Sequence, residues 1–220
     1  MKCSNELIYW MDSPDEEFAR KKILSNDDWN ERTVKDVNRI MDNLKIQPTD
    51  TVLDFGCGLG RLTKEISPLC GKIFAVDVSD SMLSLLMNYC AGFENIFMSP
   101  MHSETNIGLM DIQIDKIYSL LVLQHVEKPK AFEILKEFKR ILKPKGKIFI
   151  QYPNSLNRGF YFKYMKTKYE LGITPLVEFY SEDELRMIFK EAGLNIIRIE
   201  NDGEDFWVLA IKPEEIKVKT

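Results

Sequence analysis

The sequence lacks any long uninterrupted apolar segment, although 45% of its 220 residues are hydrophobic. A membrane-spanning helix needs about 20 consecutive apolar residues, and residues 1–6 do not lead into the apolar core of a signal peptide. We therefore expect a cytoplasmic protein with no membrane partner. The hydrophobic content is sufficient for the core of one large domain.

Neither an excess of positive charge nor a metal-binding pattern is present. The chain has 30 Lys and Arg against 34 Asp and Glu, which gives a net charge of −4 and a pI near 5.4. We do not expect a nucleic-acid partner, because attraction to phosphates depends on a positive field. The cysteines Cys3, Cys57, Cys70 and Cys90 form no CxxC pair, and there are only two histidines. We predict no metal site and interpret the cysteines as free thiols.

Short β-rich runs alternate with helical patterns from about residue 50 onward. This alternation is typical of a parallel sheet covered by helices, so the predicted fold class is a doubly wound α/β domain. The predicted strands are 51–55, 73–77, 95–98, 116–120 and 147–151, and the predicted helices are 61–69, 81–90, 129–142 and 181–193. We interpret 143–146 as a tight turn. Apolar runs at 195–199 and 206–211 predict an antiparallel hairpin, because a short polar link joins them.

Three alternate glycines follow the first predicted strand. Asp54 is the last residue but one of that strand, and Gly56, Cys57, Gly58 and Gly60 follow before the next helix. Glycines at this position let the backbone turn sharply and approach a ligand closely. The GxGxG spacing differs from the GxGxxG of dinucleotide-binding loops, whose third glycine would fall on Arg61. The loop alone is also compatible with a tight turn that binds nothing.

Asp77 strengthens the ligand interpretation, because it ends the second predicted strand. A carboxylate there can accept hydrogen bonds from both ribose hydroxyls of an adenosine. The alternative is a helix cap or a solvated loop carboxylate, since Ser79, Asp80 and Ser81 follow at once.

These features together resemble the class I S-adenosylmethionine-dependent methyltransferases. The segments that carry the resemblance are 52–61, 76–82, 119–126 and 140–147, and they fall in the order of that family. The resemblance implies a mostly parallel seven-stranded sheet with helices on both faces and an antiparallel last strand. It also implies S-adenosyl-L-methionine as the cofactor, with Asp54 and the glycine loop facing its methionine part.

The resemblance assigns further residues to the cofactor. Asp77 would hold the ribose, Val78 and Met82 would flank the adenine, and the backbone at Leu120 would border the methionine amino group. One departure is visible after the third strand, where the family usually carries an Asp near the adenine amino group. Residues 98–102 contain no acid, which leaves Ser99 or backbone groups for that contact.

The sequence indicates less about the acceptor than about the cofactor. Segments 123–126 and 151–153 loosely resemble methyltransferases that modify sugars and polyketides, so we expect a small-molecule acceptor methylated on an oxygen of a sugar or secondary metabolite. His125 is the candidate general base, because its ring titrates near neutral pH. The alternative is a histidine with a purely structural role, packed at the start of a helix.

The expected organisation is a single domain of 220 residues. We assign 1–45 to a helical N-terminal cap, 46–152 to the cofactor-binding core, 153–180 to a substrate lid and 181–220 to a C-terminal helix and hairpin. The lid is expected because this connection is long, aromatic and basic; an apolar helix packed on the sheet is its alternative. Other possible functions are a protein or RNA methyltransferase, or a catalytically silent cofactor-binding scaffold.

Overall fold

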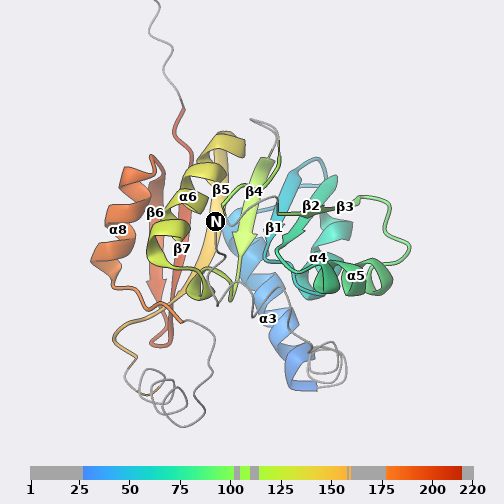
Figure 1. Ribbon diagram of the computed structural model, residues 1–220, viewed down its shortest axis with the longest axis horizontal. Coiled ribbons are helices and arrows are strands. Elements are labelled where there is room, and N and C mark those ends of the chain that lie inside the picture. The colour runs from blue at the N-terminus through green and yellow to red at the C-terminus, as the bar shows by residue number, and fades with distance from the viewer. Residues whose placement is uncertain (1–26, 102–104, 110–113, 158, 160–176, 215–220) are drawn as a thin grey trace, which may run out of the picture.

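The computed structural model describes residues 27–101, 105–109, 114–157, 159 and 177–214. Figure 1 shows the twisted central sheet with helices packed against it. The strands are β1 (Thr51–Phe55), β2 (Lys72–Asp77), β3 (Ile96–Pro100), β4 (Ile114–Ser119), β5 (Leu142–Pro153), β6 (Asn195–Asn201) and β7 (Asp205–Ile211). The helices are α3 (Asp27–Leu44), α4 (Arg61–Ile66), α5 (Asp80–Tyr89), α6 (Lys128–Ile141) and α8 (Glu182–Glu191), with short 3-10 helices η1 (Ser67–Leu69) and η2 (Leu123–His125).

The seven strands form one sheet in the order β3-β2-β1-β4-β5-β7-β6. Strands β1 to β5 pair in parallel, and β7 is antiparallel to both β5 and β6. The predicted doubly wound sheet with an antiparallel final strand is confirmed. The chain order reverses between β1 and β4, and ligands of open α/β sheets bind at the carboxyl ends of the strands beside such a reversal.

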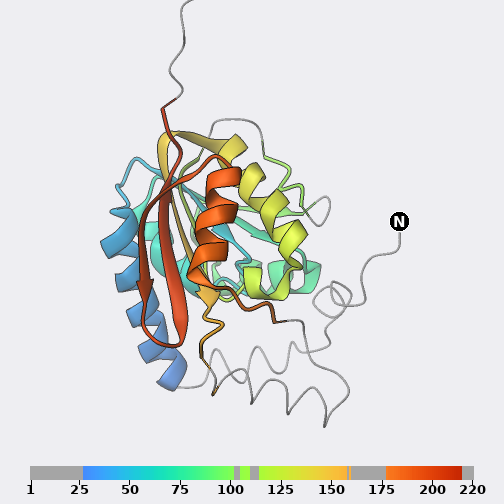
Figure 2. The same cartoon turned by 90° about the vertical axis from the view of Figure 1, so that its left-hand side faces the viewer.

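Helices cover both faces of the sheet, which explains why its parallel strands are almost continuously apolar. In β1, Val52 packs on the side of α3 and α4, whereas Leu53 packs on the side of α6 and α8. Figure 2 shows α3 on the opposite side of the sheet from α6 and α8. Each face of the sheet therefore has its own core, and the two cores together fix the position of the strands' carboxyl ends.

The carboxyl-terminal half of α3 is part of one of these cores. Ile40 and Leu44 are fully buried against Tyr118 of β4 and Phe149 of β5. Burying aliphatic side chains of this size contributes about 1.5–3 kcal/mol each. The amino end of α3 is thereby held at the carboxyl edge of the sheet, where the glycine loop lies (Figure 1).

The prediction of a tight turn at 143–146 is wrong. This segment belongs to β5, which starts at Leu142, pairs there with Ile114 and then shifts register against β4. Lys145 has a positive φ of 66°, and its amide donates to the carbonyl of Lys212, whose own amide donates to Gly146. The hydrogen bonds continue across the kink, so the lysine-rich sequence forms an irregular strand start rather than a reversal.

The closing elements agree with their sequence patterns. Ser181 and Glu184 form the reciprocal capping box at the start of α8. Strands β6 and β7 form the predicted antiparallel hairpin. Cys57, Cys70 and Cys90 are buried free thiols. No helix in the described part of the chain is long and apolar enough to cross a membrane.

Candidate functional site

The glycine loop is held against the end of β2 by backbone hydrogen bonds. The amides of Gly56 and Cys57 both donate to the carbonyl of Val76, at 2.8 and 3.0 Å. Gly56, Gly58 and Gly60 all have positive φ, at 76°, 54° and 93°. Left-handed backbone of this kind favours glycine. A side chain at Gly56 would also collide with Val122, so the first glycine is required for packing as well as for the turn.

The middle glycine differs from its neighbours in having open space around it. A Cβ atom at Gly58 would meet no other heavy atom within 4 Å, whereas one at Gly60 would lie 2.8 Å from Leu86. The positive φ favours a glycine at this position, but no neighbouring atom of the protein would exclude a side chain. Open space above a strand-to-helix loop is what a ligand needs in order to approach the backbone closely.

Asp77 connects the glycine loop to the start of α5. Its Oδ2 accepts a 2.8 Å hydrogen bond from the amide of Gly58, and its Oδ1 accepts a 2.9 Å bond from the amide of Ser79. Burial raises the pKa of this carboxyl group, and the amides of Ser79 and Gly58 oppose that rise. Ser79 in turn caps α5 through its side chain. The side chain that caps α5 is thus that of Ser79, whereas Asp77 joins the glycine loop to the residue before the helix.

Asp54 lies beneath the loop and is 3% exposed. The hydroxyl of Thr63 donates to its Oδ2 at 2.6 Å. Burial raises the pKa of Asp54 to about 6, while the Thr63 hydrogen bond and the nearby Arg61 lower it. Asp54 therefore joins β1 to α4, the helix that follows the glycine loop.

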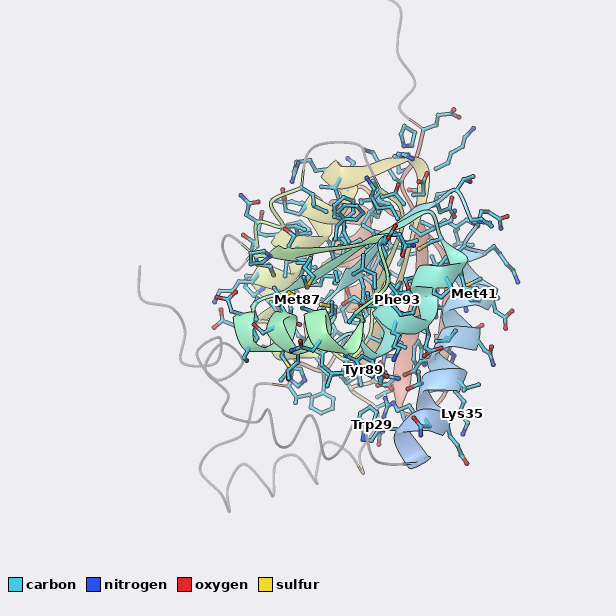
Figure 3. The ribbon with its side chains drawn as sticks, turned by 90° about the vertical axis from the view of Figure 1, so that its right-hand side faces the viewer. Trp29, Lys35, Met41, Met87, Tyr89 and Phe93 are labelled. Atoms are coloured by element: carbon cyan, nitrogen blue, oxygen red, sulfur yellow. The ribbon has the colours of Figure 1, made fainter. Side chains whose placement is uncertain are left out.

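The sequence patterns did not indicate the role of Arg61, which joins α3 to the glycine loop. Its guanidinium donates to Asp36 at 2.8 Å and to Thr33 at 3.1 Å. It also lies 5.3 Å from the ring centroid of Trp29; Figure 3 shows Trp29 in the first turn of α3. The sequence offered only one signal for this role, a basic residue directly after the third glycine. The acidic and aromatic residues that it contacts are in α3, far away in the sequence.

The other predicted cofactor residues lie at the same edge of the sheet. Leu120 is 8% exposed and directly follows β4. Val78 and Met82 are partly buried at the start of α5, where the Met82 amide donates to Ser79 Oγ. Leu121 continues the chain with a φ of 62°, an uncommon conformation for a leucine, and such strain is often found at functional sites.

The loop after β3 remains close to Asp77 despite its lack of an acid. Ser99 and Pro100 pair with Val76 and Asp77, and the Met101 amide donates to the carbonyl of Asp77 at 3.3 Å. Ser99 is thus near the expected adenine side of the site. His102 lies outside the described residues.

A polar cavity of about 440 Å³ adjoins the ends of β4, β5 and the start of β7. Its lining includes Leu121, Gln124, Gln151 and Asp205. His125 is in η2, next to Gln124, with the two side-chain nitrogens 3.1 Å apart. Within the described residues, Gln124 lines this cavity and His125 does not.

The predicted lid and cap are described only in part. Most of 153–180, at residues 158 and 160–176, lies outside the described residues, as do residues 1–26. The division of the chain into cap, core and lid therefore stays a prediction.

The fold, the glycine loop and the clamped acidic residue together define an S-adenosylmethionine-dependent methyltransferase. The chain belongs to the methyltransferase domain family, whose pattern matches residues 25–199. Its cofactor is S-adenosylmethionine, in agreement with the prediction from the sequence.

Named relatives are similar over most of the chain. A ubiquinone biosynthesis O-methyltransferase of Rickettsia bellii is 27% identical over 187 residues, covering 79% of this chain and 77% of that protein. A demethylmenaquinone methyltransferase of Tropheryma whipplei is 24% identical over 167 residues, covering 68% of each. The fold also matches magnesium protoporphyrin IX methyltransferase from Synechocystis, solved with S-adenosylhomocysteine, with a TM-score of 0.68, 14% identity and coverage of 94% and 97%.

The environment of Asp54 predicts a specific pH dependence of stability. Its pKa is about 6 in the folded protein, against 3.8 for an unperturbed aspartate side chain. The folded state therefore holds the proton more tightly, so this group lowers stability progressively as pH rises from about 4 to 6, and the loss is complete above that window. Asp54→Asn removes this dependence. The free energy of unfolding of the variant, relative to wild type, should rise by about 2 kcal/mol between pH 4.5 and pH 7.5.

Urea denaturation at the two pH values measures this change. Thr63→Val is the matched variant, because loss of its hydrogen bond raises the pKa of Asp54 further and should steepen the decline in stability. A difference between Asp54→Asn and wild type that is the same at both pH values would contradict the assignment.

Proposed function

We propose that this protein transfers the methyl group of S-adenosylmethionine to an oxygen atom of a small-molecule acceptor. The observation that carries the proposal is the polar 440 Å³ cavity whose lining includes Leu121, just after the end of β4. The next residue, Val122, lies against Gly56 of the glycine loop. A cofactor bound at the carboxyl ends of β1, β2 and β4 would lie beside this cavity, which extends toward β5. The arrangement supplies one compartment for the methyl donor and a second for its acceptor.

The described residues fit the cofactor. We assign its binding to the loop and the two flanking strand ends: Asp54, Gly56, Cys57, Gly58, Gly60, Asp77, Val78, Met82 and Leu120. Asp77 would accept hydrogen bonds from the ribose hydroxyls at the remaining lone pairs of its two oxygens, beside the amides of Gly58 and Ser79. Gly58 leaves room for the methionine part, and Asp54 supports the loop beneath it.

The cofactor supplies a methyl group on a positively charged sulfur, which is a good leaving group. The protein must therefore position the acceptor oxygen in line with that methyl group and exclude water. A hydroxyl acceptor also has to lose its proton. We retain His125 as the candidate base for this step, with Gln124 between it and the cavity.

Two observations support an oxygen acceptor. The cavity lining is rich in hydrogen-bonding side chains, and the Rickettsia relative is named as an O-methyltransferase of ubiquinone biosynthesis. The narrower prediction, a sugar or secondary metabolite, remains part of the proposal. The segment 153–180 is proposed as the lid over this acceptor.

The cofactor assignment predicts a ligand-dependent melting temperature. S-adenosylhomocysteine at 100 times its dissociation constant should stabilise the wild type by about 2.7 kcal/mol. The shift should be lost in Asp77→Ala, because the ribose hydroxyls then lack their acceptor. Thermal denaturation with and without the ligand measures this effect.

Asp80→Asn is the matched control, since Asp80 is exposed in the first turn of α5 and should leave the shift intact. No shift in folded wild type would contradict the assignment and favour a silent scaffold.

The base assignment predicts a selective kinetic defect. His125→Ala should lower kcat by about 10²-fold or more, because proton removal in the transition state contributes at that level. The dissociation constant of S-adenosylhomocysteine should change little, since the cofactor site is intact. An acceptor is first identified from a panel of hydroxyl compounds, and steady-state kinetics with it then measure kcat. Calorimetric titration with S-adenosylhomocysteine measures the dissociation constant separately. Turnover near the wild-type level would assign His125 a structural role.

A further inference from the structure

The polar cavity contains a buried side-chain pair that the methyltransferase fold does not require. Gln151 near the end of β5 is 2% exposed, and its Nε2 donates to Asp205 Oδ2 at 2.5 Å. Asp205 is the first residue of β7, directly after the β6–β7 turn. Both side chains line the cavity, so the pair lies where an acceptor would enter.

The hydrogen bond to Asp205 fixes the orientation of the Gln151 amide. Because Nε2 must be the donor, the carbonyl Oε1 is the remaining polar atom of the side chain. Oε1 is buried and has no hydrogen-bond partner among the described residues. Buried carbonyl groups without partners are rare, since desolvation costs about 1–3 kcal/mol. The unsatisfied acceptor is therefore a position where a donor from a ligand would be stabilising.

Asp205 presents a second hydrogen-bond acceptor beside the first. Its Oδ2 is held by Gln151, and its Oδ1 makes no hydrogen bond with the described part of the chain. Burial raises the pKa of this carboxyl group, the Gln151 hydrogen bond lowers it, and Asp202 and Glu204 raise it further. Asp205 is partly buried, and a carboxylate gains from a ligand donor that replaces its water.

We propose that Gln151 Oε1 and Asp205 Oδ1 together accept hydrogen bonds from two adjacent hydroxyl groups, so that the acceptor of this enzyme is a vicinal diol. The two oxygens belong to neighbouring side chains that are joined by one hydrogen bond and line the same cavity. Adjacent hydroxyls on a ring present two donors side by side, so one ligand of this kind can donate to both oxygens. This inference rests on the proposed function, and it specifies the class of substrate.

The charges around the pair favour the ionised form of Asp205 only in part. Arg32 of α3 also lines the cavity and lies close enough to lower the pKa of Asp205, whereas Asp202 and Glu204 raise it. A single hydroxyl would donate to only one of the two acceptors, so it would form one hydrogen bond fewer than a diol and bind more weakly.

The cavity also places the diol next to the methyl donor. Leu121, which directly follows the backbone assigned to the methionine amino group, lines the same cavity as Gln151. One hydroxyl can then face the cofactor while its neighbour is held by the pair. Gln151 and Asp205 are thus assigned to specificity, and His125 remains the candidate base.

Ligand-observed NMR titration of the full-length protein, saturated with S-adenosylhomocysteine, tests this proposal. The diol probes are catechol and methyl α-D-glucopyranoside, and phenol and cyclohexanol are the single-hydroxyl comparisons. At least one diol should bind more tightly than the matching mono-alcohol. Its dissociation constant should rise about tenfold or more in Asp205→Asn, because the Asn amide presents a donor where the diol needs an acceptor. Preference for catechol would indicate an aromatic diol, and preference for the glycoside a sugar.

Glu204→Gln is the matched control. Glu204 also lines the cavity but is exposed, so this variant removes the same charge without removing either proposed acceptor, and it should change the constant less than about threefold. Gln151→Met removes the other acceptor oxygen and should also weaken diol binding, which keeps the test valid if Asp205→Asn does not fold. Equal diol binding by wild type, Asp205→Asn and Gln151→Met, or no diol binding to the wild-type complex, would overturn the inference. Failure of S-adenosylhomocysteine to bind the wild type would instead overturn the proposed function.

Discussion

The hydrogen bonds accepted by Asp77 hold the functional edge of this protein together. One carboxylate oxygen binds the Gly58 amide and the other binds the Ser79 amide. Two segments that follow different strands are thereby joined through the end of β2. The three glycines of the loop are fixed in a left-handed conformation that only glycine adopts readily. Both compartments of the site depend on this geometry.

The rest of the structure supports that edge from two sides. On one face, α3 is anchored in the core through Ile40 and Leu44 and contacts the loop through the Asp36–Arg61 ion pair. On the other side, β7 runs antiparallel to β5 and brings Asp205 beside Gln151. The antiparallel last strand therefore has a chemical consequence, because it places a carboxylate next to the expected acceptor position.

The fold and the identity of the cofactor could be predicted from the sequence because both depend on local patterns. The alternation of strands and helices, the GxGxG spacing and Asp77 are each readable within short segments. The 143–146 segment was misassigned because its turn-like lysines and glycine continue a strand only through pairing with distant residues, including Lys212. The Arg61–Asp36 and Gln151–Asp205 pairs were missed for the same reason: their members are far apart in sequence and meet only in the folded protein.

A crystal structure of the complex with S-adenosylhomocysteine tests the central claim most directly. The account predicts both ribose hydroxyls within about 3.2 Å of the Asp77 carboxylate oxygens, the methionine part over Gly58, and the sulfur facing the cavity lined by Leu121 and Gln151. A ligand whose ribose is bound elsewhere, with Asp77 still bonded only to Gly58 and Ser79, would contradict it.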